Sequence, residues 1–194
     1  MYRHGVDKAA LVQINGWFDN SYPIECMRRF PGRFSVVVVV DTDQRDAPGQ
    51  LEAWVEQEGE GIRLRPTTRS PGRYAFAIWK KASDLGVPVS CVGTIDQYAS
   101  SDLEVLIQGF PHLKIIVEHL GGVGGLLGEC DSTPPHNTYR KVLALSKYPN
   151  VYMKVPGLGE ISTLAMPVKT PCPVDDAPPL IEMAIEAFGA NRLM

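Results

Sequence analysis

The chain has 194 residues, a formal net charge of −3 and 44% hydrophobic residues, which is the composition of an ordinary globular protein. The slightly acidic balance and the lack of a basic patch argue against nucleic-acid binding, and no apolar run approaches the roughly 20 residues that cross a bilayer. The length suits one domain over 1–194.

Short apolar runs rich in valine and isoleucine alternate with helix-like segments along the whole chain. Six such runs predict strands that are buried on both faces of a parallel sheet, at 8–14, 34–41, 61–66, 87–93, 113–121 and 151–155. Helices are predicted over 21–30, 51–59, 74–86, 101–110, 137–148 and 178–189. The two least regular stretches, 125–135 and 157–179, are expected to be long loops.

Three of the predicted helices have residues at one end that are typical of helix termini. Asp19 and Asn20 can cap the first helix, and Ser101 with Glu104 has the spacing of a capping box. Gly86 is a good residue to end the third helix.

The repeated strand–helix unit predicts an α/β fold, either a doubly wound sheet or a (β/α)8 barrel. A nucleotide-binding sheet should show its glycine fingerprint after an early strand. The glycine-rich turn GGVGGLLG follows the fifth run instead, lacks the G-x-G-x-x-G spacing and has no P-loop lysine. We therefore favour the barrel and expect no nucleotide cofactor.

The four cysteines, Cys26, Cys91, Cys130 and Cys172, are widely spaced and form no Cys-x-x-Cys pair. We expect reduced thiols in a cytoplasmic protein. A structural zinc at Cys130 and His136 is not favoured, because no second pair with ligand spacing accompanies them.

The first candidate for chemistry is His119, which ends the run LKIIVEH just before two glycines. In a barrel, the carboxyl ends of the strands face the active site, so a histidine here can reach it. Strand alternation puts His119 on the face of Leu113, Ile115 and Val117, and Glu118 on the other. A histidine packed within the core is the structural alternative.

Two arginines and two further charged residues complete the candidate set. Arg63 and Arg65 share one face of the third run, where arginines are costly unless they are paired or face a polar cavity. A bidentate arginine is a natural grip for a substrate carboxylate, although an internal salt bridge to Asp41 is the alternative. Asp41 equally suits a turn, and Lys154 either reaches the site or extends its side chain towards the outer helix layer.

Several stretches, among them IIVEHLGG, YPNVYMKVPGL and FGANRLM, together resemble the amidohydrolase superfamily in its amidohydrolase-2 (amidohydrolase-related) branch. The resemblance runs from one end of the chain to the other. It implies a (β/α)8 barrel of the kind found in metal-dependent hydrolases, lactonases and decarboxylases. His119 matches the family's metal-ligand or active-site histidine, and Arg63 matches an arginine associated with the substrate carboxylate in lactonase-like members.

The chain also departs from the family pattern. The His-x-His metal pair of the family's first strand and the glycine-serine-aspartate motif of its eighth are absent from the 194 residues. We therefore expect an incomplete barrel, strands two to seven with the start of the eighth, since a full barrel takes about 250 residues. Unpaired strand edges would make the chain associate or aggregate, with a homodimer as one form. The run VPVSCVG has no terminal histidine, which resembles lactonase-type members without a binuclear centre.

For a complete barrel, the sequence thus predicts a hydrolase of a small carboxylate-bearing carbonyl compound, such as a lactone, whereas the 194 residues alone are expected to be inactive. His119 would polarise the carbonyl or bind a divalent metal such as zinc or manganese. Arg63, Arg65, Lys154 and Asp41 would contact the substrate. A metal-dependent decarboxylase and an inactive barrel fragment are the alternatives.

Overall fold

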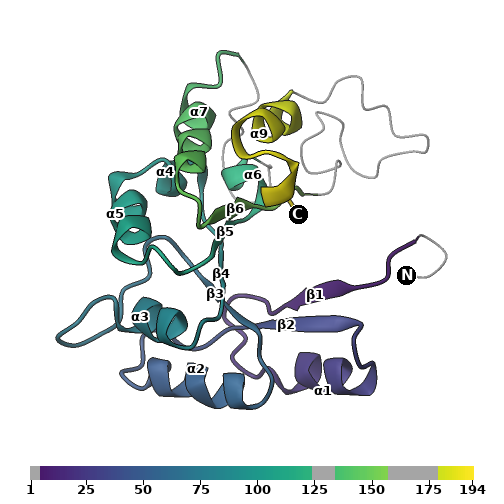
Figure 1. Ribbon diagram of the computed structural model, residues 1–194. Coiled ribbons are helices and arrows are strands. Elements are labelled where there is room, and N and C mark those ends of the chain that lie inside the picture. The colour runs from purple at the N-terminus through teal and green to yellow at the C-terminus, as the bar shows by residue number, and fades with distance from the viewer. Residues whose placement is uncertain (1–4, 124–133, 157–178) are drawn as a thin grey trace. The chain divides into compact units, whose positions relative to one another are not determined.

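The computed structural model describes residues 5–123, 134–156 and 179–194 (Figure 1). The chain divides into two compact units, Met1–Ser90 and Cys91–Met194, which are described in turn. Cys130, Cys172 and nearly all of the two predicted loops lie outside the described residues. In the part of the chain that is described, no helix is long and apolar enough to cross a membrane.

The first unit contains three strands, each followed by a helix. The elements are β1 (Ala9–Val12), α1 (Ser21–Arg29), β2 (Phe34–Val38), α2 (Ala47–Glu56), β3 (Gly61–Leu64) and α3 (Ala77–Asp84), and β4 (Val89–Cys91) follows. The strands run parallel in chain order, with Ala9 opposite Phe34 and Val37 opposite Gly61. The amide of Ile62 then donates to the carbonyl of Pro88 at 3.0 Å.

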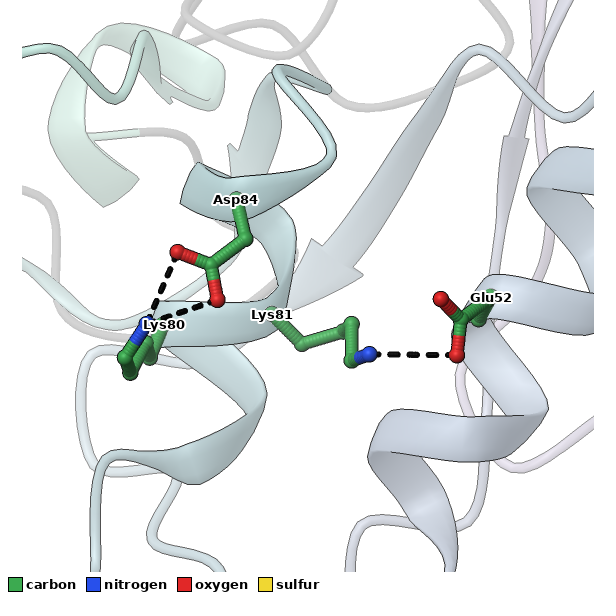
Figure 2. A network of polar contacts seen from close by, with 4 residues as sticks. All are labelled: Glu52, Lys80, Lys81 and Asp84. Atoms are coloured by element: carbon green, nitrogen blue, oxygen red, sulfur yellow. Dashed lines mark hydrogen bonds and ion pairs between the residues drawn. The ribbon is translucent and has the colours of Figure 1, made fainter.

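Apolar side chains hold this unit together. Leu51, Ile62, Ile78 and Trp79 are fully buried, so the helices α2 and α3 cover the sheet with their apolar faces. Figure 2 shows two ion pairs of these helices: Lys81 of α3 contacts Glu52 of α2 at 3.1 Å, and Lys80 contacts Asp84 within α3 at 2.7 Å. Such exposed pairs contribute little, typically about 0.2–1 kcal/mol each.

The second unit continues the same alternation. Its elements after β4 are α4 (Ile95–Tyr98), α5 (Ser101–Gly109), β5 (Ile115–Val117), α6 (His119–Gly122), α7 (Asn137–Leu143), η2 (Ala144–Lys147), β6 (Val151–Met153), α9 (Leu180–Phe188) and η3 (Ala190–Arg192). β5 and β6 are parallel, and the amide of Glu118 donates to the carbonyl of Cys91 at 3.0 Å.

The last residues begin another strand, as the sequence predicts. Leu193 forms a parallel bridge with Met153. The amide of Met194 donates to Met153 at 3.1 Å, and Met194 accepts from Val155 at 2.7 Å. The segment FGANRLM therefore carries the chain from α9 into the strand that follows β6.

All six predicted strands are present, each shorter than predicted, and so are the six predicted helices. Two short helices, α4 and α6, were missed. The predicted capping box at Ser101 and Glu104 is wrong. Ser100 caps α5 by accepting from Leu103, and the capping box lies at Thr94 and Gln97, where it starts α4. Gly86 ends α3 with a φ of 68°, as expected.

The outer side of β1 and α1 is apolar and exposed. Ile14 is 63% exposed, Tyr22 77% and Phe30 49%. Together with β1 they line a groove of ≈ 490 Å³. The predicted association of the chain through an unpaired strand edge stays a prediction.

Candidate active site

A cavity lies at the carboxyl ends of β1, β2 and β3 in the first unit. It measures ≈ 310 Å³, and its polar, charged and aromatic lining residues include Asn15, Phe18, Asp41, Asp43, Arg63, Arg65 and Thr68. Parallel βα repeats carry their chemistry at this end of the strands, because the loops there are free to vary without disturbing the sheet.

Arg63 is the half-buried cation of this cavity. It lies within β3, and its Nη1 donates to the carbonyl of Gln13 at 3.3 Å. A guanidinium offers five N–H donors in a fixed plane, a geometry that suits a carboxylate. Arg63 lines this cavity, and its contact with a substrate carboxylate stays a prediction.

Arg65 differs from the expectation of two arginines on one buried strand. β3 ends at Leu64, and Arg65 is exposed in the turn that follows. Its amide donates to the hydroxyl of Thr68 at 3.0 Å, and its carbonyl accepts from the amide of Thr68 at 2.9 Å. Arg65 thus borders the cavity from a turn, where its side chain is free of the cost of burial.

Asp41 lies in a turn, which is one of the roles that the sequence analysis left open. Its Oδ1 accepts from the amide of Asp43 at 3.1 Å, and its Oδ2 accepts from Nε2 of Gln44 at 3.2 Å. These are the bonds of a turn opened by an aspartate. Asp41 therefore shapes the rim of the cavity after β2.

His119 lies at the carboxyl end of β5 in the second unit, at the start of an unusual backbone run. The φ angles of His119, Leu120, Gly121 and Gly122 are 51°, 48°, 70° and 79°. A positive φ is costly for a bulky residue such as Leu120 and tends to persist at functional sites. β5 ends at Val117, so the predicted alternation does not carry on to His119.

The two glycines of this run are required by their neighbours. A Cβ on Gly121 would meet the side chain of Val142 at 2.5 Å. A Cβ on Gly122 would meet the backbone N of Ile95 at 2.8 Å and the carbonyl of Gly93 at 2.9 Å. The pair that follows His119 in the sequence thus marks a close backbone approach as well as a turn.

Glu118 is a residue of this site that sequence reasoning missed. Its side chain is fully buried, and its Oε2 lies 3.4 Å from Nε2 of His119, which is 22% exposed. The signal was present in the sequence, since a glutamate directly follows the apolar run. Strand alternation alone gave it no role, because it placed Glu118 on the face opposite His119.

Lys154 follows β6 and is half-buried. Its amide donates to the carbonyl of Val117 at 2.8 Å, and its carbonyl accepts from the amide of Leu120 at 2.9 Å. The backbone of Lys154 therefore ties the end of β6 to the His119 turn.

Two buried groups beside β5 stay protonated. Burial, and then the charge of Glu118, raises the pKa of the Cys91 thiol, so this cysteine is not a thiolate nucleophile. Burial also raises the pKa of Tyr98, whose hydroxyl donates to the carbonyl of Cys91. Both groups support the end of β4 as neutral side chains.

The sequence profile of the Amidohydrolase family matches residues 3–194. The chain belongs to the amidohydrolase family. No curated protein matches it.

Solved structures with the same fold align with this amidohydrolase over its whole length. A putative 2-pyrone-4,6-dicarboxylic acid hydrolase from Pseudomonas putida is 21% identical, with a TM-score of 0.69, over 100% of this chain and 67% of that chain. An amidohydrolase from Burkholderia multivorans with bound zinc is 16% identical, with a TM-score of 0.67, over 100% and 69%. The 5-carboxyvanillate decarboxylase of Sphingomonas paucimobilis is 13% identical, with a TM-score of 0.61, over 100% and 69%.

These likenesses confirm the predicted fold class, an incomplete (β/α)8 barrel. The described residues of the amidohydrolase chain form six strands and the start of another, and the chain spans about two thirds of the length of these solved structures. Identities this low establish the fold and leave the reaction to the residues of the site.

A metal is the cofactor expected for an amidohydrolase, so the described side chains are compared with the set of ligands that a metal needs. Glu118 and His119 lie together, but a catalytic zinc needs three protein ligands. No group of three or more histidine, cysteine, aspartate or glutamate side chains comes together within residues 5–123, 134–156 and 179–194. The described donors do not make a complete metal site, and we derive no step through a metal.

Proposed function

We propose that this amidohydrolase hydrolyses a small carbonyl compound that carries a carboxylate, such as a lactone. The observation that carries the proposal is the cavity at the ends of β1, β2 and β3, which Arg63 and Arg65 line together with Asp41 and Asp43. Arginine binds carboxylates through paired N–H donors, and such charge-assisted bonds are about twice as strong as neutral ones.

Arg63 is the better placed of the two to bind the substrate carboxylate. It is half-buried, and its Nη1 is already oriented by the carbonyl of Gln13. Water screens its charge less than that of the exposed Arg65. Arg65 would add positive charge at the edge of the cavity, and Asp41 would shape its rim.

His119 would polarise the carbonyl that water attacks. It lies at the carboxyl end of a parallel strand, the end at which barrels carry their catalytic groups. A rigid left-handed turn fixes its backbone, and Glu118 lies 3.4 Å from its Nε2. Preorganised polar groups of this kind lower a barrier because they need not reorient during the reaction. Addition of water to the carbonyl and cleavage of the ring C–O bond would give a hydroxy acid.

The test is hydrolysis of a panel of carboxylated and uncarboxylated lactones by the full-length protein, by its His119→Ala variant and by its His112→Ala variant. His112 is an exposed histidine before β5 and serves as the matched control. We expect turnover of carboxylated lactones, a loss of about 100-fold or more in His119→Ala and none in His112→Ala. Equal rates in all three proteins would remove His119 from the mechanism. Release of carbon dioxide from an aromatic carboxylate, without lactone hydrolysis, would replace the hydrolase by a decarboxylase.

A further inference from the structure

The loop between β1 and α1, residues 13–20, forms one wall of the cavity that holds Arg63. Asn15, Gly16 and Phe18 of this loop line the cavity. At the start of the loop, the carbonyl of Gln13 accepts the hydrogen bond from Arg63. The position of the loop therefore influences where the guanidinium lies.

Asn20 fixes the far end of this loop. Its side chain is fully buried, its Nδ2 donates to the carbonyl of Val39 at 2.9 Å, and its Oδ1 accepts from the amide of Val39 at 3.0 Å. The pair of bonds imitates a backbone pairing just beyond Val38, where β2 ends. The same Nδ2 donates to the carbonyl of Phe18 at 3.1 Å. Only a carboxamide offers both donors and an acceptor in this space.

The sequence predicted a different role for Asn20. It is the residue before α1, but its side chain makes no bond that caps the helix. Asp19 accepts from the amide and the hydroxyl of Ser21 instead. The Asn20 side chain is thus committed to β2 and to the loop.

The side chain of Gln13 joins the two ends of the loop. Its Nε2 donates to the carbonyl of Asp19 at 2.7 Å, and its Oε1 accepts from the amide of Ile14 at 2.9 Å. Its own amide donates to Val37 at 3.0 Å, which continues the pairing of β1 with β2. Both ends of the loop are therefore held to β2 and to each other.

We propose that Asn20 and Gln13 are positioning residues that hold Arg63 in the geometry in which it binds a carboxylate. The inference rests on the proposed role of Arg63. Neither side chain belongs to the set that lines the cavity in the described part of the chain, so each acts through the loop. Losing either side chain removes no group that would touch the ligand.

The experiment follows the side-chain N–H signals of Arg63 by NMR in the purified protein, assigned with Arg63→Lys, and titrates phthalate as a planar dicarboxylate probe. Asn20→Asp keeps the size and the acceptor but removes both donors. We expect the Arg63 signal to shift and broaden, and the affinity for phthalate to fall about tenfold, the value of one bond to a charged group.

Asn150→Asp is the matched control in the second unit. Asn150 also donates to two carbonyls, those of Phe110 at 3.2 Å and Leu113 at 3.0 Å. We expect this variant to lose stability while the Arg63 signal and the phthalate affinity stay as in the wild type. A merely structural role of Asn20 would make the two variants behave alike.

Gln13→Ala gives a second route if Asn20→Asp does not fold, because it keeps the carbonyl that Arg63 contacts. An Arg63 signal that stays unchanged in a folded Asn20→Asp or Gln13→Ala protein would overturn the inference. A wild type that does not bind phthalate would contradict the proposed function, while the Arg63 signal still decides the positioning role.

Discussion

The carboxyl end of β3 and the carboxyl end of β5 each present a basic side chain, but they hold it in different ways. Arg63 in the first unit is held by hydrogen bonds, beside a cavity whose wall depends on Asn20 and Gln13. His119 in the second unit is held by its own backbone, on four consecutive residues with positive φ. A binding group can thus be oriented by side chains, whereas the candidate catalytic group is oriented by the main chain. The two ends should therefore respond to different substitutions.

The largest loss of unfolding free energy is expected for Gly122→Ala, which changes the backbone of the His119 turn in the second unit. A methyl group there would lie 2.8 Å from the N of Ile95, on a residue whose φ is 79°. Strain at a positive φ and overpacking each cost about 1–3 kcal/mol, so we expect the free energy of unfolding to fall by about 3 kcal/mol. Urea denaturation measures it.

Gly109→Ala is the matched control for this substitution. Gly109 is the last residue of α5, and nothing lies within 4 Å of an added methyl group. An alanine in a helix is favoured over glycine by about 0.5–1 kcal/mol, so this variant should be as stable as the wild type or slightly more so. Equal losses in the two variants would mean that the His119 turn is not held by close backbone packing.

Side chains that support the same turn should matter less than its backbone. Tyr98→Phe removes the hydroxyl that donates to the carbonyl of Cys91, and that carbonyl keeps its bond from the amide of Glu118. We expect a loss of about 1 kcal/mol in unfolding free energy. Tyr74→Phe, at a residue that is 48% exposed, should show no change. A loss in Tyr98→Phe as large as that in Gly122→Ala would remove the contrast between main chain and side chains.

The smallest effect on unfolding free energy is expected for a substitution of Glu104, which lies away from the carboxyl ends of β3 and β5. Hydrogen bonds from Lys147 and then Tyr148 lower the pKa of this carboxyl group. A lowered pKa stabilises the folded chain above the unfolded value of about 4.3, and this stability is lost as the pH falls through the folded pKa. Glu104→Gln should therefore be less stable than the wild type near neutral pH and approach it in acid. A difference in unfolding free energy that stays constant with pH would contradict this.

The sequence predicts the strands and the position of His119 well, for a physical reason. Valine and isoleucine runs favour buried parallel strands wherever they occur, and the glycines after His119 mark the point at which β5 ends. The burial of Glu118 could not be predicted in this way, because a charged residue in an alternating pattern is expected to face solvent. The positive φ of Leu120 could not be predicted from the sequence either, since bulky residues rarely adopt a positive φ.

The roles of Arg65, Asp41 and Asn20 show a second limit of sequence reasoning. Each lies just past the end of a strand or just before a helix, where one residue decides between strand, turn and cap. β3 ends before Arg65, Asp41 opens a turn, and the Asn20 side chain bonds to Val39 in place of the helix. These outcomes depend on contacts between segments that are distant in sequence.

The most direct test of the account is the binding of phthalate to the purified protein, compared with Arg63→Lys and with the control Arg73→Lys at an exposed site. Lysine keeps the charge but loses the paired donors. We predict saturable binding that weakens about 10- to 100-fold in Arg63→Lys and is unchanged in Arg73→Lys. Equal affinity in all three proteins, or no binding by the wild type, would contradict a carboxylate site at the end of β3.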